Sequence, residues 1–197
     1  MPISAAQRDR TMSEAHIKRT VICQGDLAVS GDRDVMLSAV LGSCIATCLW
    51  DPVARVGGMN HILLPDQGGT IREDTKFGIF AMETLINEMM KIGARKSNLV
   101  AKLFGGALTF ENELRIGDAN VTFARDFFNL EGIPLIAEST GGGCARRIRY
   151  FPENGKAKQM FTTDPDTLAQ VVQPATRGNI KPHTAKPGMA GQVEIFK

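Results

Sequence analysis

Short hydrophobic runs, separated by glycine and proline, dominate the middle of the chain. Runs typical of strands cover residues 35–41, 44–50, 56–64, 98–104, 133–138, 146–151 and 156–161. Two segments instead repeat hydrophobic residues at helical spacing: 74–92, which Gly93 ends, and 120–130, which Gly132 ends. Strands and helices in this mixed order predict one α/β domain. We expect a layered sandwich of a mixed β-sheet and helices, not a doubly wound nucleotide-binding fold.

The two ends of the chain differ from this middle part. Residues 1–19 are polar and lack periodicity, which predicts a flexible N-terminal tail before a domain at 20–163. Proline and glycine become frequent from residue 164, which predicts a flexible C-terminal tail over 164–197. Hydrophobic and polar residues alternate again at 191–197. That alternation fits either a frayed terminus or a short strand that docks on a partner or on the domain's own sheet edge.

Composition narrows the class of protein. Hydrophobic residues make up 43% of the chain, enough for a core. The 23 basic and 21 acidic residues nearly balance, and no basic block interleaves with aromatic residues, so a nucleic-acid partner is not expected. Residues 1–20 lack the hydrophobic region of a signal peptide, and no hydrophobic run is long enough to insert into a membrane. We therefore expect a cytoplasmic protein.

One cysteine and one histidine form the strongest candidate for chemistry. Cys44 begins the 44–50 run, Asp51 and Pro52 predict a turn, and His61 lies near the end of the returning 56–64 run. A hairpin of this kind brings the thiol close to the imidazole. Free cysteine titrates near 8.5, and an adjacent imidazole can accept its proton and hold the thiolate as an ion pair. The pair is therefore a candidate nucleophile and base.

The residues before Cys44 suit the same chemistry. Gly42 allows the backbone to approach a substrate closely. Amide groups near Ser43 and Cys44 could form an oxyanion hole. The alternative is structural, because cysteine is often buried and a single histidine on a hydrophobic strand is usually a core residue.

Zinc is a second alternative for these side chains. Cys44, Cys48, Cys144 and His61 could supply four tetrahedral ligands. No Cys-x-x-Cys pair is present, however, and Cys44 and Cys48 lie well apart along one strand, which rises about 3.3 Å per residue. We therefore expect no metal site. With Cys23, the four cysteines are also too few and too irregular for a disulfide framework.

A set of motifs follows in a fixed order along the chain: Leu41-Gly42-Ser43-Cys44, Cys48-Leu49-Trp50-Asp51-Pro52, Gly57-Gly58-Met59-Asn60-His61, Leu64-Pro65, Lys76-Phe77-Gly78, Ala81-Met82, Lys102-Leu103-Phe104-Gly105-Gly106-Ala107, Ile116-Gly117-Asp118-Ala119-Asn120, Gly141-Gly142-Gly143 and Arg146-Arg147-Ile148. In their order and spacing these motifs make the chain resemble the chemoreceptor glutamine deamidase (CheD) family over about residues 20–163.

This resemblance implies a function and a triad. It implies hydrolytic deamidation of specific glutamine side chains on the cytoplasmic helices of methyl-accepting chemotaxis receptors, which tunes adaptation. Cys44 and His61 match the first two members of the family's Cys-His-Thr triad. The threonine lies six positions before the cysteine, which here is Ser38, so Ser38 or a backbone carbonyl would orient the His61 ring. The scheme needs no metal or organic cofactor, and a CheC-type phosphatase is a possible partner.

Two other functions stay open from the sequence. A non-catalytic module could share the fold and bind receptors or a CheC-type phosphatase without needing the thiol. A general cysteine amidase or thiol protease would share the Cys-His chemistry but act on small amides or on the peptide backbone.

Overall fold

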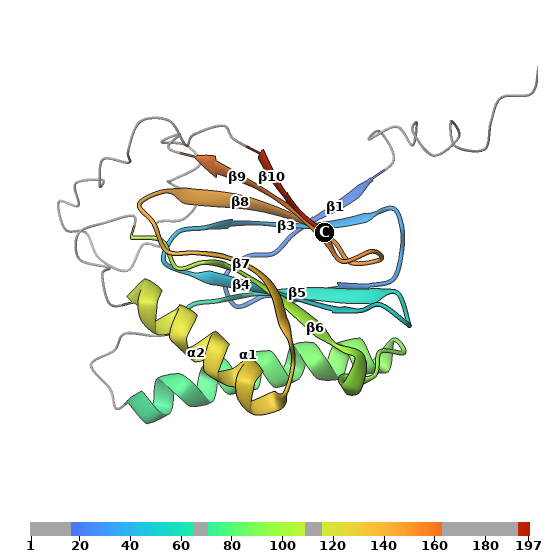
Figure 1. Cartoon of the computed structure of the whole chain (residues 1–197), viewed down its shortest axis with the longest axis horizontal. Coiled ribbons are helices and arrows are strands. Elements are labelled where there is room, and N and C mark those ends of the chain that lie inside the picture. The colour runs from blue at the N-terminus through green and yellow to red at the C-terminus, as the bar shows by residue number, and fades with distance from the viewer. Residues whose placement is uncertain (1–16, 65–70, 109–115, 163–192) are drawn as a thin grey trace, which may run out of the picture.

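Two five-stranded sheets form the centre of the molecule (Figure 1). The computed structural model describes residues 17–64, 71–108, 116–162 and 193–197. Sheet A contains, in spatial order, β1 (Lys18–Val21), β3 (Val35–Leu41), β8 (Ala145–Phe151), β9 (Lys156–Thr162) and β10 (Val193–Phe196). Sheet B contains β2 (Leu27–Ser30), β5 (Val56–Ile62), β4 (Ile45–Asp51), β6 (Val100–Gly105) and β7 (Leu135–Thr140). Each sheet includes one parallel pair, β1 with β3 and β6 with β7.

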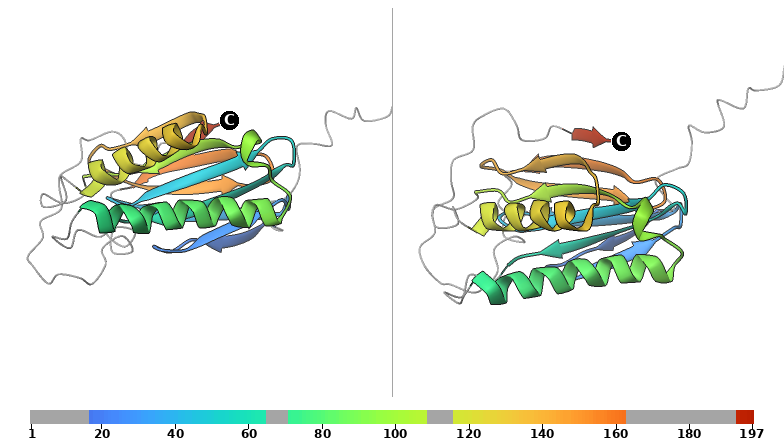
Figure 2. Two further views of the ribbon diagram at one scale, coloured as in Figure 1. Left: turned by 90° about the horizontal axis from the view of Figure 1, so that it is seen from below. Right: turned by 60° about the horizontal axis from the view of Figure 1, so that its bottom comes forward.

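The helices and sheets stack as three layers. Helices α1 (Ile71–Lys91) and α2 (Ile116–Glu131) lie on the same side of sheet B, and sheet A lies on its other side (Figures 1 and 2). Strand alternation in β4 divides the core accordingly. Ile45 and Leu49 pack toward helix residues such as Met82 and Leu85, whereas Ala46 and Cys48 pack toward sheet A. The predicted layered α/β sandwich is confirmed.

The predicted elements differ from the structure mainly at their ends. Both helices begin earlier than predicted, at Ile71 and Ile116 in place of residues 74 and 120. Strands β1 and β2 were missed, because each is only four residues long and therefore too short to show a clear periodic pattern. β1 begins at Lys18, so the predicted tail over 1–19 extends two residues too far, and residues 1–16 lie outside the described residues.

The end of the chain forms the edge strand of sheet A. β10 pairs antiparallel with β9, so the hypothesis of docking on the domain's own sheet edge describes residues 193–196, while 163–192 lie outside the described residues. The Phe196 ring packs edge-to-face on Phe104, with 5.1 Å between ring centroids. The buried Lys102 ammonium donates hydrogen bonds to the carbonyls of Gly155 (2.8 Å) and Phe196 (3.2 Å). A buried ammonium needs such acceptors, so the strand and Lys102 stabilise each other.

This arrangement gives a stability prediction. Phe196→Ala removes the ring that packs on Phe104, and we expect the free energy of unfolding to fall by about 2 kcal/mol. Ile195→Ala is the matched control, because Ile195 is the neighbouring residue of the same strand and its side chain is 59% exposed. Urea unfolding of both variants measures the difference. Equal effects of the two substitutions would show that Phe196 does not anchor the strand.

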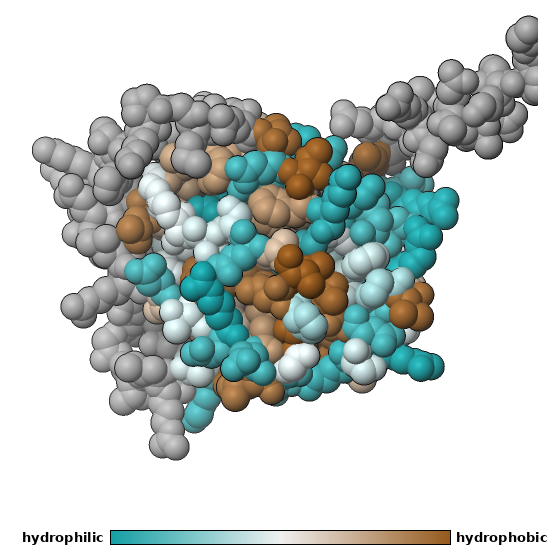
Figure 3. Space-filling view, in the orientation of Figure 1, coloured by the Kyte–Doolittle hydropathy of each residue, from teal (hydrophilic) through white to brown (hydrophobic). Residues whose placement is uncertain are grey.

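On the face that Figure 3 shows, hydrophobic side chains gather near the centre and hydrophilic ones surround them. The exposed large hydrophobic side chains include Phe80 (68%) and Leu130 (84%). Neither α1 nor α2 is long and apolar enough to cross a membrane.

Candidate active site

The segment Gly42-Ser43-Cys44, which we call the Cys44 bend, carries the chain from β3 in sheet A to β4 in sheet B. Its three carbonyl groups all accept hydrogen bonds. The Gly42 carbonyl accepts from the Ala107 amide (2.7 Å), and the Cys44 carbonyl accepts from the Gly106 amide (2.8 Å). The Ser43 carbonyl accepts from the side-chain amide of Asn120 (3.0 Å). The bend is therefore fixed from the carbonyl side by the segment after β6 and by α2.

Glycine is required where β6 meets this bend. Gly105 has φ 111°, and a Cβ atom there would lie 2.1 Å from the Cys44 carbonyl oxygen. Its own carbonyl accepts a hydrogen bond from the Gly141 amide (2.9 Å), and the Gly142 carbonyl accepts from the Leu108 amide (2.8 Å). The two glycine-rich segments, Gly105-Gly106 and Gly141-Gly142-Gly143, therefore lie beside each other, and the first of them contacts the Cys44 bend.

Arg146 fixes the second glycine-rich segment. Its side chain is 1% exposed, and it donates hydrogen bonds to the carbonyls of Ser139 and Gly141. Burial lowers its pKa to about 10. Alternation along β8 turns Arg146 toward the core between the sheets, on the same face as Ile148 and Tyr150.

Asn120 is a site residue to which the sequence assigned no role. Its side chain is fully buried, donates to the Ser43 carbonyl and accepts from the Leu64 amide (2.8 Å). It therefore joins the Cys44 bend to the segment that follows His61. The sequence signal was its place in the Ile116-Gly117-Asp118-Ala119-Asn120 motif.

Replacement of Asn120 should impair the site through this link. Asn120→Asp keeps the shape and the acceptor oxygen but removes the donor to the Ser43 carbonyl, so we expect the rate of the reaction at Cys44 to fall by roughly tenfold or more. Asn129→Asp is the control, because Asn129 lies on an exposed part of the same helix. A normal rate for Asn120→Asp would contradict a positioning role.

His61 lies in β5, and its hydrogen bonds determine which ring nitrogen can act as a base. The Nδ1 atom lies 3.1 Å from the Ile22 carbonyl oxygen. A carbonyl only accepts, so Nδ1 carries the proton and Nε2 is the free acceptor of the neutral ring. Nε2 is buried and has no hydrogen-bond partner within the described residues. Burial lowers the pKa of His61, and the Ile22 carbonyl and Asp26 only partly offset this. The ring is therefore neutral at pH 7.

The strand register places Cys44 beside His61. His61 on β5 pairs with Ala46 on β4. Cys44 lies two positions before Ala46, so its side chain is on the same face and diagonal to His61. Such diagonal positions lie about 7–8 Å apart, within reach of a thiol and an imidazole. In this structure the thiol donates to the Gln24 side-chain oxygen, with 3.6 Å between Cys44 Sγ and Gln24 Oε1. The predicted hairpin therefore exists, and the thiol must turn from Gln24 to reach Nε2.

The Ser38 hydroxyl does not orient the His61 ring in this structure. Leu37 and Ala39 point into the core between the sheets, so Ser38 points to the other face of sheet A by alternation. Its backbone is nevertheless connected to the site, because the Ser38 carbonyl accepts from the Ile22 amide (2.8 Å). The Ile22 carbonyl in turn holds His61. A backbone carbonyl therefore occupies the orienting position, and the sequence could not identify Ile22 as its source.

The sequence predicts that the backbone N–H groups of Gly42 and Ser43 form an oxyanion hole. In the described part of the chain, neither Gly42 nor Ser43 donates its backbone N–H to a protein acceptor. The carbonyls of the bend are directed at the segment after β6 and at α2, and an oxyanion role for these N–H groups stays a prediction. Ser43 and Cys44 are both nearly buried, at 6% and 5% exposure.

The other cysteines lie in different surroundings. Cys23 is exposed, whereas Cys48 and Cys144 are buried, and all are free thiols. Among the described residues, no three His, Cys, Asp or Glu side chains are grouped so that they could hold a metal ion.

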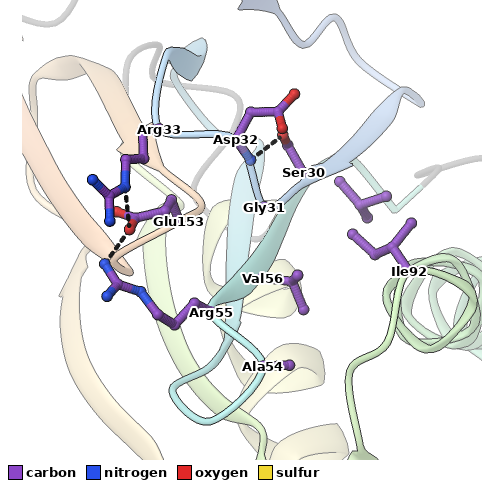
Figure 4. Close-up of a pocket in the computed structure, with 10 residues that line it drawn as sticks. Ser30, Gly31, Asp32, Arg33, Ala54, Arg55, Val56, Ile92 and Glu153 are labelled. Carbon is purple, nitrogen blue, oxygen red and sulfur yellow. Dashed lines mark hydrogen bonds and ion pairs between the residues drawn. The ribbon is translucent and has the colours of Figure 1, made fainter.

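A cavity of about 660 Å³ lies at the far end of β4 from Cys44. The turn at Ala54–Val56, the segment after β2 and Glu153 line it (Figure 4). Arg33 and Arg55 both form ion pairs with Glu153, so the charged groups there neutralise one another. Its lining contains neither a cysteine nor a histidine, and we place the candidate active site at Cys44.

Comparison with known proteins agrees with the motifs. Residues 63–160 match the family model described as CheD chemotactic sensory transduction. The chain is 42% identical over 186 residues to the probable chemoreceptor glutamine deamidase CheD of Agrobacterium fabrum, covering 94% of this chain and 100% of that protein. The chain belongs to the CheD family. CheD proteins with the same description from Rhizobium rhizogenes and a Caulobacter species are 45% and 40% identical, over 80% and 94% of this chain and 88% and 100% of theirs.

Among solved structures, this CheD-family chain is similar to the Neisseria meningitidis protein NMB0706 of family-model DUF152. The TM-score is 0.45, the sequence identity is 12%, and 68% of each chain is covered.

Proposed function

We propose that this CheD-family protein is a protein-glutamine glutaminase that deamidates specific glutamine side chains on the cytoplasmic helices of chemotaxis receptors. Relatives at 40–45% identity carry the description of probable chemoreceptor glutamine deamidase. The observation that carries the proposal is the orientation of His61. The Ile22 carbonyl holds Nδ1 at 3.1 Å, which leaves the unpartnered Nε2 as a base beside a nearly buried thiol.

The first half of the reaction forms a thioester. His61 Nε2 accepts the Cys44 proton, and the thiolate attacks the amide carbon of the substrate glutamine. The carbonyl oxygen becomes an oxyanion, which the amides of Gly42 and Ser43 stabilise. The imidazolium then donates its proton to the departing nitrogen. Ammonia leaves, and the acyl group stays on the sulfur.

The second half hydrolyses the thioester. His61, again neutral, removes a proton from water, and the hydroxide attacks the thioester carbonyl. The same amides stabilise the second oxyanion. Its collapse releases glutamate, and the proton on His61 returns to Cys44. One water is consumed and one ammonia is produced, so this scheme assigns no step to a metal or an organic cofactor.

Ser38 has a positioning role in this scheme. Its carbonyl holds the Ile22 amide, and the Ile22 carbonyl orients His61. A CheC-type phosphatase is proposed as a second partner on the family resemblance alone, and copurification of the two proteins tests it.

The intact mass of a purified receptor cytoplasmic fragment tests the function. Incubation with the protein should add about one dalton for each glutamine converted to glutamate, and peptide mapping identifies the sites. A small amide such as free glutamine and an unrelated unfolded protein serve as alternative substrates. Hydrolysis of either in place of the receptor would favour a general amidase or protease. Binding to the receptor without a mass change would favour the non-catalytic module.

A further inference from the structure

The thiol of Cys44 has a carboxamide next to it that the reaction scheme does not use. Gln24 lies in the 22–26 loop between β1 and β2, and its side-chain oxygen lies 3.6 Å from the Cys44 sulfur. The substrate of the proposed reaction is also a carboxamide, so Gln24 places the substrate's own functional group beside the nucleophile.

The 22–26 loop holds Gln24 there through the same residue that acts as the base. The Asp26 carbonyl accepts from the His61 amide (3.1 Å), and the His61 carbonyl accepts from the Gly25 amide (2.8 Å). Gly25 has φ 85°, a conformation that glycine adopts readily and that turns the chain back after Gln24. The loop therefore positions two groups at once: the Ile22 carbonyl at the imidazole and the Gln24 carboxamide at the thiol.

The two ends of the carboxamide suit different states of the sulfur. A thiol can donate a weak hydrogen bond to Oε1, which is the contact in the structure. A thiolate can only accept, so the Nε2–H group must face it, and rotation of the terminal torsion of glutamine exchanges the two ends.

We propose that Gln24 is a further catalytic residue, whose side-chain N–H stabilises the negative charge of the reacting Cys44 group. This inference rests on the proposed function and adds a hydrogen-bond donor to it. The negative charge lies first on the Cys44 sulfur and then on the oxyanion oxygen, which is bonded to the same carbon as the sulfur. The side chain of Gln24 contacts the first of these positions.

The strengths of the two hydrogen bonds decide the sign of the effect. The S–H to oxygen bond of the resting thiol is a weak neutral one, whereas an N–H bond to an anion is charge-assisted and about twice as strong as a neutral one. Gln24 therefore stabilises the reacting states more than the resting state, which lowers the barrier. A residue that only held the thiol away from His61 would have the opposite effect.

Two substitutions and one control test the proposal. Gln24→Leu keeps the volume but removes the donor, and we expect kcat/KM on the receptor fragment to fall about a hundredfold. The pH profile of Cys44 alkylation by iodoacetamide should move upward by about one pH unit. Gln24→Glu places a carboxylate beside the sulfur, so we expect a larger fall in kcat/KM and a larger upward shift of the alkylation profile than for Gln24→Leu. Cys23→Ser, in the same loop with an exposed side chain, should change neither quantity.

The outcomes separate this proposal from the proposed function. If Cys44→Ala is inactive while Gln24→Leu keeps the normal rate and alkylation profile, the deamidase stands and the role of Gln24 is refuted. A slower Gln24→Leu with an unchanged profile, or a faster variant, also refutes it. In the wild type, a Cys44-dependent gain of one dalton at Gln24 would make this residue a substrate and overturn the donor role. Full activity of Cys44→Ala would instead refute the proposed function itself.

Discussion

Replacement of Cys44 by alanine should abolish deamidation, with no mass change in the receptor fragment, while the fold is retained. The substitution removes one sulfur atom, and without it neither the attack on the amide carbon nor the thioester can occur. The fold should survive because the Cys44 bend is held by its backbone carbonyls, which the substitution leaves in place. Thermal unfolding of the variant checks this.

Cys48→Ala is the matched control for this substitution. Cys48 lies four residues further along the chain, in β4, and it is 1% exposed in the core between the sheets. Burial raises the pKa of its thiol, and the Lys102 ammonium offsets this only in part. The Cys48 thiol is therefore protonated at any working pH, and Cys48→Ala should retain activity.

Alkylation identifies the reactive thiol directly. Work in the Cys23→Ser background removes the one exposed cysteine. Iodoacetamide should then label Cys44 well below pH 8, faster than Cys48 or Cys144, with the labelled peptide identified by mass. Comparable activity losses in Cys44→Ala and Cys48→Ala would contradict the assignment of the nucleophile. So would labelling that follows an ordinary thiol curve near 8.5 and does not depend on His61.

The sequence predicted the layers of the fold because long strands and helices carry strong periodic signals. The strand at 35–41 is predicted to the residue, since it is bounded by polar residues and glycine. The short strands β1 and β2 are set by pairing with β3 and β5, and their own four residues contain little information about this. Pairing with distant strands therefore determines that β1 and β2 form, which the local sequence pattern does not predict.

The candidate site divides in the same way. Cys44 and His61 belong to one hairpin, so their proximity follows from strand spacing and a local turn. Ile22, Gln24 and Asn120 reach the site through β1 and α2, and their contacts depend on long-range packing. A carbonyl that orients a histidine leaves no signal in residue identity, because every residue has one. The place of Ser38 could not be derived either, since it depends on which face of sheet A packs on sheet B.

Replacement of His61 by asparagine should reduce deamidation by at least about a thousandfold, because both the base and the acid of the reaction are lost. An asparagine N–H can still donate to the Ile22 carbonyl, so the 22–26 loop should keep its place. Ser38→Ala should have a much smaller effect, since the Ser38 contribution is made by its backbone carbonyl. Equal losses in the two variants would show that the Ser38 hydroxyl is indispensable.

The same histidine should also appear in the pH dependence of rate and stability. Burial lowers the pKa of folded His61 below its ordinary value near 6.5, so its base form persists below pH 6.5 and the acid limb of kcat/KM for the wild type should lie there. An unfolded chain protonates this histidine near pH 6.5, whereas the folded chain does so only at lower pH. The unfolded state thus binds more protons in that window, and stability is lost as the pH falls below about 6.5.

Urea unfolding at pH 7.5 and pH 5.5 measures this loss in the wild type and in His61→Asn. The variant has no group with this pKa difference between folded and unfolded states at position 61, so its stability should fall less between the two values. An identical fall in both proteins would mean that His61 titrates in the folded state as it does in the unfolded chain. The neutral buried base on which the proposed mechanism depends would then be absent.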